Sequence, residues 1–247
     1  MFRKLFAKPE ISASAPPGRR IYAVGDVHGC AAELDALMDL IAADADGIAD
    51  ARIVFLGDYV DRGPDTPGVL DRLIAIGAER PQTVFLKGNH EAALLDFLHA
   101  PEDMRHWLDW GGEETLRSYG VDGSPSRPGE EIAADLAETM PEAHFAFLTA
   151  LDLKHIEGDY LFVHAGVRPG VALEEQDEQD LLWIRRRFHN AAPHERPAYT
   201  VVHGHERVPK ALDAGWRIGV DTGACWTGRL TAVALEGRTR RFITAKA

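Results

Sequence analysis

Three short polar runs near the start of the chain contain side chains that can bind divalent metal ions. Residues 25–29 are Gly-Asp-Val-His-Gly, residues 57–63 are Gly-Asp-Tyr-Val-Asp-Arg-Gly, and residues 88–91 are Gly-Asn-His-Glu. Carboxylate, amide and imidazole groups are all ligands for such ions. Each run directly follows an apolar stretch, where a buried strand ends and a loop begins. Together the runs indicate a phosphoester hydrolase with two metal ions.

The apolar stretches before these runs predict strands of a sheet that is covered on both faces. They are residues 21–24, 53–56 and 84–86. An amphipathic helical pattern fills each interval between them. Strand–helix–strand units of this length place the carboxyl ends of neighbouring parallel strands at one edge of the sheet. Asp26, Asp58 and Asn89 are therefore expected to converge at that edge.

The second half of the chain repeats this arrangement with different polar clusters. The predicted strands and clusters are residues 161–163 followed by His164, residues 200–202 followed by His203 and His205, and residues 218–220 followed by Asp221. Residues 230–235 and 242–244 predict two further strands. Glycines beside the polar clusters fit strands that turn sharply and bring their backbone close to an anion or a metal.

The composition predicts one large α/β domain, residues 20–247, in a chain of 247 residues. A net charge of −12 argues against a nucleic-acid surface, because binding to the phosphate backbone requires an electropositive footprint. Two cysteines are too few for a disulfide framework and fit a reducing compartment. With no secretory signal and no stretch long enough for a membrane span, we expect a cytoplasmic protein without stable membrane insertion. Residues 1–19 are expected to be a flexible lead-in.

Residues 92–155 are predicted to form a helical cap insertion beside the site. Helical patterns extend over residues 92–99, 107–119 and 130–151. Trp107 and Trp110 are spaced i, i+3 and are interpreted as packing a helix rather than binding a ligand. Because this segment contains no metal-ligand cluster, we expect it to shape access of the substrate.

A phosphoester resists attack because its phosphoryl oxygens repel the nucleophile. Two divalent ions about 3.5–4 Å apart neutralise these oxygens and lower the pKa of a bridging water, which yields hydroxide near neutral pH. Such a site requires one carboxylate that both ions share, and Asp58 is the candidate. The other predicted ligands are Asp26 and His28 for one ion, and Asn89, His164 and His205 for the other. Oxygen and nitrogen ligands without a thiolate favour Mn²⁺, with Fe or Zn²⁺ as alternatives.

Other residues of the motifs are predicted to act on the substrate. His90 follows a ligand and can protonate the leaving oxygen, while Asp61 can hold its ring and raise its pKa. Arg62 and Arg185 offer planar guanidinium forks for the phosphoryl oxygens, whereas Lys87 offers a point charge. The candidate catalytic residues are His90, Asp61, Arg62 and Arg185, and the candidate substrate-binding residues are Arg62, Lys87 and Arg185.

The three runs resemble the signatures of the phosphoprotein phosphatase family of metallophosphoesterases, and the chain is most similar to the short bacterial and phage branch of lambda-phosphatase type. The similarity covers residues 20–236, through His164-Ala165-Gly166, Trp183-Ile184-Arg185, Gly204-His205 and Asp221-Thr222-Gly223-Ala224. The resemblance implies a four-layer α/β/β/α sandwich with a dinuclear metal site at the carboxyl ends of the strands. It implies the same ligand set, with His90 and Asp61 as the acid pair and two arginines on the phosphate.

The chain departs from the family pattern at two positions. Lys87 stands before Gly-Asn-His-Glu, where the family usually has arginine, so the charge is kept but the bidentate fork is lost. His203 lies beside His205. The spacing to Asp221 matches the family when His205 is the ligand, and His203 is interpreted as a neighbour behind it.

Three functions are consistent with the sequence. The resemblance implies a serine/threonine protein phosphatase, in which a metal-bridging hydroxide attacks the phosphorus of a phosphoprotein or phosphopeptide. The alternative is a hydrolase of dinucleoside polyphosphates, other nucleotides or small phosphoesters. The complete Asp-Tyr-Val-Asp-Arg run and Glu91 favour the first, because symmetrical tetraphosphatases tend to lack that run and to carry aspartate after Gly-Asn-His. A docking module without turnover requires a missing catalytic group, and none is missing.

Overall fold

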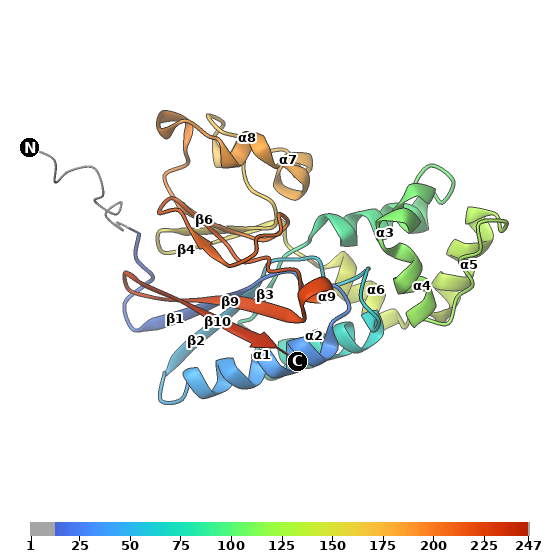
Figure 1. The fold of residues 1–247 in the computed structure, drawn as a ribbon, viewed down its shortest axis with the longest axis horizontal. Coiled ribbons are helices and arrows are strands. Elements are labelled where there is room, and N and C mark those ends of the chain that lie inside the picture. The colour runs from blue at the N-terminus through green and yellow to red at the C-terminus, as the bar shows by residue number, and fades with distance from the viewer. Residues whose placement is uncertain (1–12, 247) are drawn as a thin grey trace, which may run out of the picture.

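Two sheets of five strands each form the centre of the computed structural model, which describes residues 13–246 (Figure 1). The first sheet has the order β10-β9-β1-β2-β3 and the second the order β4-β5-β6-β8-β7. The first consists of β1 (Arg19–Val24), β2 (Asp50–Phe55), β3 (Val84–Phe85), β9 (Arg229–Glu236) and β10 (Thr239–Lys246). The second consists of β4 (Lys154–Glu157), β5 (Tyr160–Val163), β6 (Thr200–His203), β7 (Leu212–Asp213) and β8 (Arg217–Gly219).

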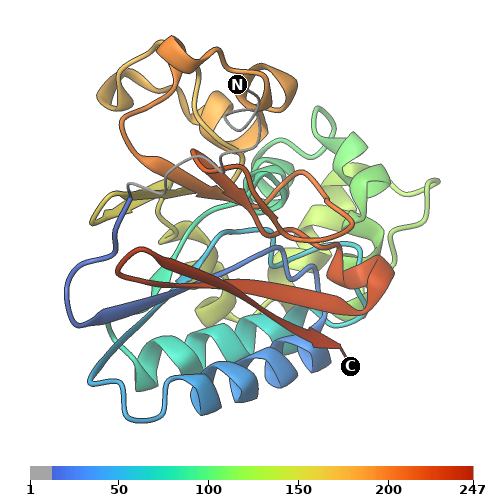
Figure 2. The same cartoon turned by 60° about the vertical axis from the view of Figure 1, so that its left-hand side comes forward.

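The predicted strand–helix–strand units are present in the first sheet. β1, β2 and β3 are parallel, and Val24, Phe55 and Phe85 lie in register at their carboxyl ends. The crossovers are α1 (Ala31–Asp44) and α2 (Thr66–Glu79), which cover the outer face of this sheet (Figures 1 and 2). Polar residues that follow these three strands therefore share one edge of the sheet.

The second sheet is covered on its outer face by α7 (Glu178–Trp183) and α8 (Arg186–His189) (Figure 1). Its three central strands, β5, β6 and β8, are parallel, as the apolar stretches predict. The edge strands β4 and β7 were not predicted. Both residues of β7 are exposed and Ile156 of β4 is 42% exposed, so neither strand has the continuous apolar pattern of a buried strand.

The two sheets pack face to face around an apolar layer. Ile21, Val54 and Leu56 from the first sheet contact side chains such as Phe162 and Val202 from the second, and all five are almost completely buried. Burial of such side chains contributes about 1.5–3 kcal/mol each relative to exposure. The predicted four-layer α/β/β/α sandwich is confirmed, and this packing brings the carboxyl ends of both sets of parallel strands together.

Helices fill the segment that the sequence predicts as a cap, residues 92–155. They are α3 (Asn89–His99), η1 (Arg105–Trp110), α4 (Gly112–Ser118), α5 (Gly129–Thr139) and α6 (Glu142–Thr149). The single helix predicted over 130–151 is two helices, because Pro141 follows Met140 and cannot continue the hydrogen-bond ladder of α5. The remaining short helices are η2 (Leu173–Glu175), η3 (Pro193–Glu195) and α9 (Ala224–Thr227).

The segment before β1 differs in part from the predicted flexible lead-in. Residues 1–12 lie outside the described residues. Ala13 and Ala15 are 5% and 2% exposed, the amide of Ala15 donates to the carbonyl of Gly237 at 2.9 Å, and β1 already begins at Arg19. The burial of these two alanines and the hydrogen bond of Ala15 hold residues 13–15 against the rest of the fold. Across residues 13–246, every helix is too short or too polar to cross a lipid bilayer.

Candidate metal centre

The fold brings the predicted metal ligands together at the carboxyl ends of the strands. Two groups of three side chains could each hold a metal ion, because the potential ligand atoms within each group all lie within 4.8 Å of one another. They are His28, Asp58 and His90, and Asp58, His164 and His205. All are buried. Asp58 belongs to both groups, which is the position required of a carboxylate shared by two ions.

The other two predicted ligands, Asp26 and Asn89, contact residues of the second group. Both carboxylate oxygens of Asp26 accept a hydrogen bond from the backbone amide of His205, at 3.2 and 3.1 Å. Asn89 Oδ1 lies 2.9 Å from His164 Nε2 and 2.8 Å from His205 Nδ1. Six side chains from five separate loops therefore form one buried cluster.

Backbone strain in the described chain is concentrated at this cluster. Among residues 13–246, the non-glycine residues with positive φ are His28 (46°), Asp58 (55°), Asp61 (69°), Arg62 (67°) and His205 (62°). Residues other than glycine rarely adopt this left-handed backbone region, and such strain persists only where the surrounding structure enforces it. Every one of these residues was predicted to belong to the site.

Two glycines are required where the backbone passes closest to a ligand. A Cβ at Gly88 would lie 2.1 Å from Oδ1 of Asp58, and a Cβ at Gly204 would lie 2.0 Å from Oδ1 of Asp26. Neither neighbour can move without changing the position of a ligand carboxylate. Their positions agree with the prediction that glycines allow the backbone to approach the ligands closely.

Backbone carbonyls fix the orientation of two histidines. Nδ1 of His28 lies 2.8 Å from the carbonyl of Val60, and Nδ1 of His164 lies 2.8 Å from the carbonyl of Leu56. Since a carbonyl only accepts, each Nδ1 carries the hydrogen and each Nε2 carries an electron pair. That of His164 faces the cluster, whereas that of His28 accepts a hydrogen bond from Arg62 at 2.7 Å. Carbonyl partners of this kind are typical of histidines that bind metals.

The cluster contains more acceptors than the described side chains can satisfy. Nε2 of His164 faces two acceptor oxygens, Asn89 Oδ1 at 2.9 Å and Asp58 Oδ1 at 3.4 Å. Nε2 of His205 is buried and has no hydrogen-bond partner. Protons do not resolve this arrangement at neutral pH, because burial lowers the pKa of His164 and lowers that of His205 to about 2. Cations held between these groups do resolve it.

The carboxylates point to the same conclusion. Burial, followed by the charges of Asp221 and Asp58, raises the pKa of Asp26 well above its usual value. Burial also raises the pKa of Asp221 to about 6. For Asp58, the surrounding histidines are protonated in the acidic range where its carboxyl titrates, and their charges outweigh burial, so its pKa is lowered. Three buried carboxylates this close require positive charge beyond that of Arg62, and the nitrogen and oxygen donor set fits divalent metal ions.

Glu91 holds the loop that carries Asp58. Its buried carboxylate accepts hydrogen bonds from the backbone amides of Asp58, Tyr59, Val60 and Gly88, at 2.7–3.1 Å. The side chain therefore positions a ligand without contacting the cluster itself. Its place at the start of α3, directly after Asn89 and His90, is the sequence signal for this role.

His90 and Asp61 form the predicted pair. His90 Nδ1 lies 2.7 Å from Asp61 Oδ2, and Asp61 also accepts hydrogen bonds from Trp107 Nε1 at 2.8 Å and Thr115 Oγ1 at 2.7 Å. Burial lowers the pKa of His90, but Asp58 and the hydrogen bond and charge of Asp61 outweigh it, so the pKa is raised. Trp107 and Thr115 were not predicted to contact the site, since a helical spacing does not show which side chain the helix faces.

A cleft of about 510 Å³ opens beside His90 and Asn89. Both predicted phosphate-binding arginines, Arg62 and Arg185, line it, together with Trp110, Trp183 and Trp226. The guanidinium of Arg62 is held by the carbonyl of Trp110 at 3.2 Å and by His28 Nε2 at 2.7 Å. Trp110, interpreted from the sequence as packing a helix, thus lies at the wall of this cleft.

Lys87 and His203 lie apart from this cleft. Lys87 Nζ is 3.6 Å from a carboxylate oxygen of Glu178 on α7, and Lys87 is not among the residues that line the cleft. The His203 ring is buried, packs against Phe188, and lies 3.0 Å from the carbonyl of Gly204. This position agrees with its interpretation as a neighbour of the ligand His205.

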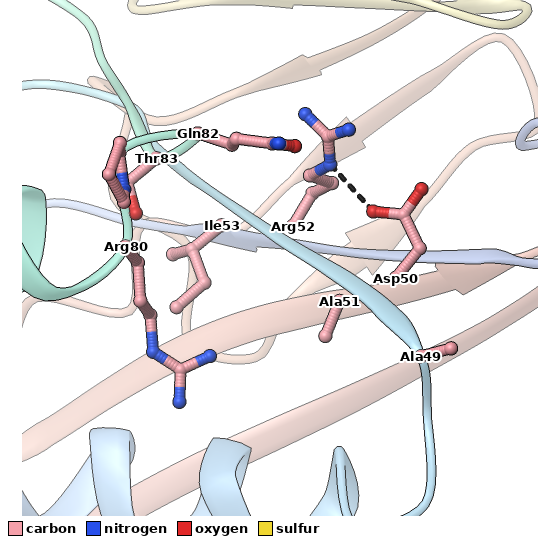
Figure 3. Close-up of a pocket in the computed structure, with 9 residues that line it drawn as sticks. Ala49, Asp50, Ala51, Arg52, Ile53, Arg80, Gln82 and Thr83 are labelled. Atoms are coloured by element: carbon pink, nitrogen blue, oxygen red, sulfur yellow. Dashed lines mark hydrogen bonds and ion pairs between the residues drawn. The ribbon is translucent and has the colours of Figure 1, made fainter.

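A smaller hollow of about 240 Å³ lies at the other end of β2 (Figure 3). It includes Asp50, whose carboxylate accepts a hydrogen bond from Arg52 Nε at 2.7 Å, and Arg80. None of the predicted site residues lines it. The strand β2 separates this hollow from Asp58, so it takes no part in the cluster described above.

The fold and the shared-carboxylate cluster define a metal-dependent phosphoesterase. Residues 19–232 match the calcineurin-like phosphoesterase family, and the chain belongs to that family of hydrolases. It is 27% identical to the symmetrical bis(5'-nucleosyl)-tetraphosphatase of Methylococcus capsulatus, over 90% of this chain and 94% of that protein.

Two further comparisons concern protein phosphatases. The chain is 28% identical to serine/threonine-protein phosphatase 1 of Salmonella typhimurium, over 88% of this chain and 93% of that protein. A protein serine/threonine phosphatase from Saccharomyces cerevisiae has the same fold, with a TM-score of 0.61 and 17% identity over 94% of this chain and 81% of that one.

Proposed function

We propose that this protein hydrolyses dinucleoside polyphosphates at a pair of divalent metal ions. The observation that carries the proposal is the cleft beside the ligands, where two arginines suited to phosphate lie among three tryptophans suited to nucleobases. Several tetraphosphatases among the relatives support it, including the one from Methylococcus capsulatus. We therefore prefer the dinucleoside polyphosphate hydrolase, which the sequence leaves open as the alternative, to the protein phosphatase.

The proposed roles follow from the geometry of the cluster. Asp58 would be shared by the two ions, and the other residues that would hold them are Asp26, His28, Asn89, His164 and His205. When bound, the ions supply positive charge for the phosphoryl oxygens and activate the attacking water. The oxygen and nitrogen donors suit Mn²⁺.

The remaining steps belong to side chains of the cleft. Arg62 and Arg185 bind and orient the phosphoryl oxygens of the substrate. As the bond from phosphorus to the leaving oxygen breaks, His90 gives its proton to that oxygen. Asp61 holds the His90 ring and favours its protonated form. Trp107 and Thr115 fix Asp61 in turn, so that the cap helices support the acid group.

A protein phosphatase remains the second candidate. The complete Asp-Tyr-Val-Asp-Arg run, Glu91 after Gly-Asn-His, and the Salmonella typhimurium relative favour it. Turnover of diadenosine tetraphosphate and of a phosphoserine peptide, measured side by side with Mn²⁺ supplied, tests the proposal. We expect a higher kcat/KM for diadenosine tetraphosphate, and a higher value for the peptide would favour the second candidate instead.

A further inference from the structure

The cleft contains two aromatic surfaces whose rings are not among the proposed ligands of the ions or of the phosphate. The Trp226 surface is the indole of Trp226 on α9, which is 55% exposed, with the guanidinium groups of Arg207 and Arg62 4.6 and 5.0 Å from its ring centre. The Trp183 surface is formed by Trp183 and Trp110, whose ring centres are 5.3 Å apart. Large aromatic rings left open to solvent beside a polar site are typical of ligand contacts.

The two surfaces lie near histidines of different ligand groups. The Trp226 ring is 6.3 Å from the ring of His28, which belongs to one ligand group, and the Trp183 ring is 6.5 Å from that of His205, which belongs to the other. Figures 1 and 2 show α9 beside the first sheet and α7 on the far side of the second. A ligand whose phosphates span both ligand groups therefore meets an aromatic surface near each group.

The charges around each surface suit a nucleoside. Indole rings and guanidinium planes both stack on bases, as the Trp226 surface with Arg207 can do. Asp109 and Glu114 also line the cleft. Carboxylates placed there repel phosphate but accept hydrogen bonds from the hydroxyls of a ribose.

We propose that the two surfaces are nucleoside subsites, and that the two bases of a dinucleoside polyphosphate stack on them while its phosphates cross the cluster between them. This inference rests on the proposed function and adds where each half of the substrate binds. A phosphoserine peptide presents one phosphate and no obligatory ring on either side. Two aromatic surfaces beside different ligand groups match a ligand with an aromatic group at both ends.

Alanine substitutions test the subsites in the metal-loaded full-length protein. We compare diadenosine tetraphosphate with inorganic tetraphosphate, which has the charge but no base. Trp226→Ala and Trp183→Ala are each expected to lower the ratio of kcat/KM for the two substrates by about 5-fold or more, mainly through KM, as expected for a lost base stack. Phenylalanine at either position is expected to restore most of the loss, since the aromatic face is kept.

A matched control is Phe145→Ala on α6, because Phe145 is 47% exposed but lines a different hollow. The ratio is expected to stay at the wild-type value in this variant. If wild-type protein hydrolyses diadenosine tetraphosphate but neither tryptophan variant changes the ratio, the subsites are disproved while the proposed function stands.

A binding measurement separates the reverse case. If diadenosine tetraphosphate is not hydrolysed, the proposed function is wrong, and inhibition of p-nitrophenyl phosphate hydrolysis by AMP and by ribose 5-phosphate is compared. If AMP inhibits at least 5-fold more tightly than ribose 5-phosphate, and both tryptophan variants lose this difference, the nucleoside subsites are supported although the proposed function is wrong. Equal inhibition by AMP and ribose 5-phosphate overturns the subsites. They are also overturned if the tryptophan variants lower turnover of a phosphoserine peptide but leave inhibition by AMP unchanged.

Discussion

Replacement of His90 by asparagine tests whether this imidazole protonates the leaving oxygen. Its Nδ1 is held by Asp61 at 2.7 Å, while its Nε2 lies 4.0 Å from Asp58 Oδ2 and faces the ligand cluster. His90 also lines the cleft. Loss of a general acid lowers a rate about 10²- to 10⁴-fold, which is about 2.7–5.5 kcal/mol of transition-state stabilisation. Asparagine retains a polar side chain, so the loss reports the proton rather than a cavity.

The assay compares two monoesters whose leaving groups differ in basicity. Phenolate leaves poorly without a proton, whereas p-nitrophenolate leaves well. We expect His90→Asn to lower kcat for phenyl phosphate within the range above, to lower kcat for p-nitrophenyl phosphate much less, and to keep wild-type metal content. His99→Asn is a control from the same helix, since His99 lines a separate hollow. An equal loss on both esters, or a loss of metal together with activity, would refute the acid role.

The pH profile gives an independent check of the same pair. Asp61 raises the pKa of His90, so the protonated imidazole persists to higher pH than burial alone would allow. With Asp61→Asn that contribution is lost and the pKa of His90 falls. Because an acid must be protonated to act, the alkaline limb of kcat against pH is expected to move to lower pH. An unchanged limb in a folded variant would show that another group titrates there.

Three further predictions concern metal binding and stability. Asp58→Asn is expected to reduce the binding of both ions, because its carboxylate belongs to both ligand groups, and a variant that retains two tightly bound ions would contradict this. Gly204→Ala is expected to weaken metal binding, because its Cβ would lie 2.0 Å from Asp26 Oδ1, and a variant with wild-type metal affinity would contradict this. The hydrogen bond from Arg241, with help from Tyr22, lowers the pKa of Asp44 to about 2, below the unfolded value of about 3.9. The stabilisation by Asp44 is therefore present above pH ~4 and lost as pH falls through about 2. The Tm difference between wild type and Asp44→Asn should shrink over that range. A constant Tm difference would exclude this linkage.

The parallel strands and the convergence of the candidate ligands could be predicted because their signals are local. Asp26, Asp58 and Asn89 each follow a short apolar stretch at a turn that contains glycine, and parallel topology alone brings such turns together. The same reasoning placed His164 and His205 in the cluster. The edge strand β7 gave no signal, since its pairing depends on β8 and its residues remain exposed.

Contacts between distant segments could not be predicted in the same way. Trp107 and Trp110 have a spacing that fits a packed helix, and Trp107 is indeed fully buried. Only the tertiary structure shows that its indole donates to Asp61 and that Trp110 borders the cleft. The exposed indole of Trp226 was also missed, because a single aromatic residue after a polar turn has no periodicity that distinguishes a ligand contact from a surface residue.

The most direct test of the account is the number and position of metal ions in the loaded protein. We predict two divalent ions per chain, found by elemental analysis and by anomalous scattering from a crystal, about 3.5–4 Å apart with an Asp58 oxygen between them. Absence of bound ions, a single ion, or ions located away from His28 and His205 would contradict it.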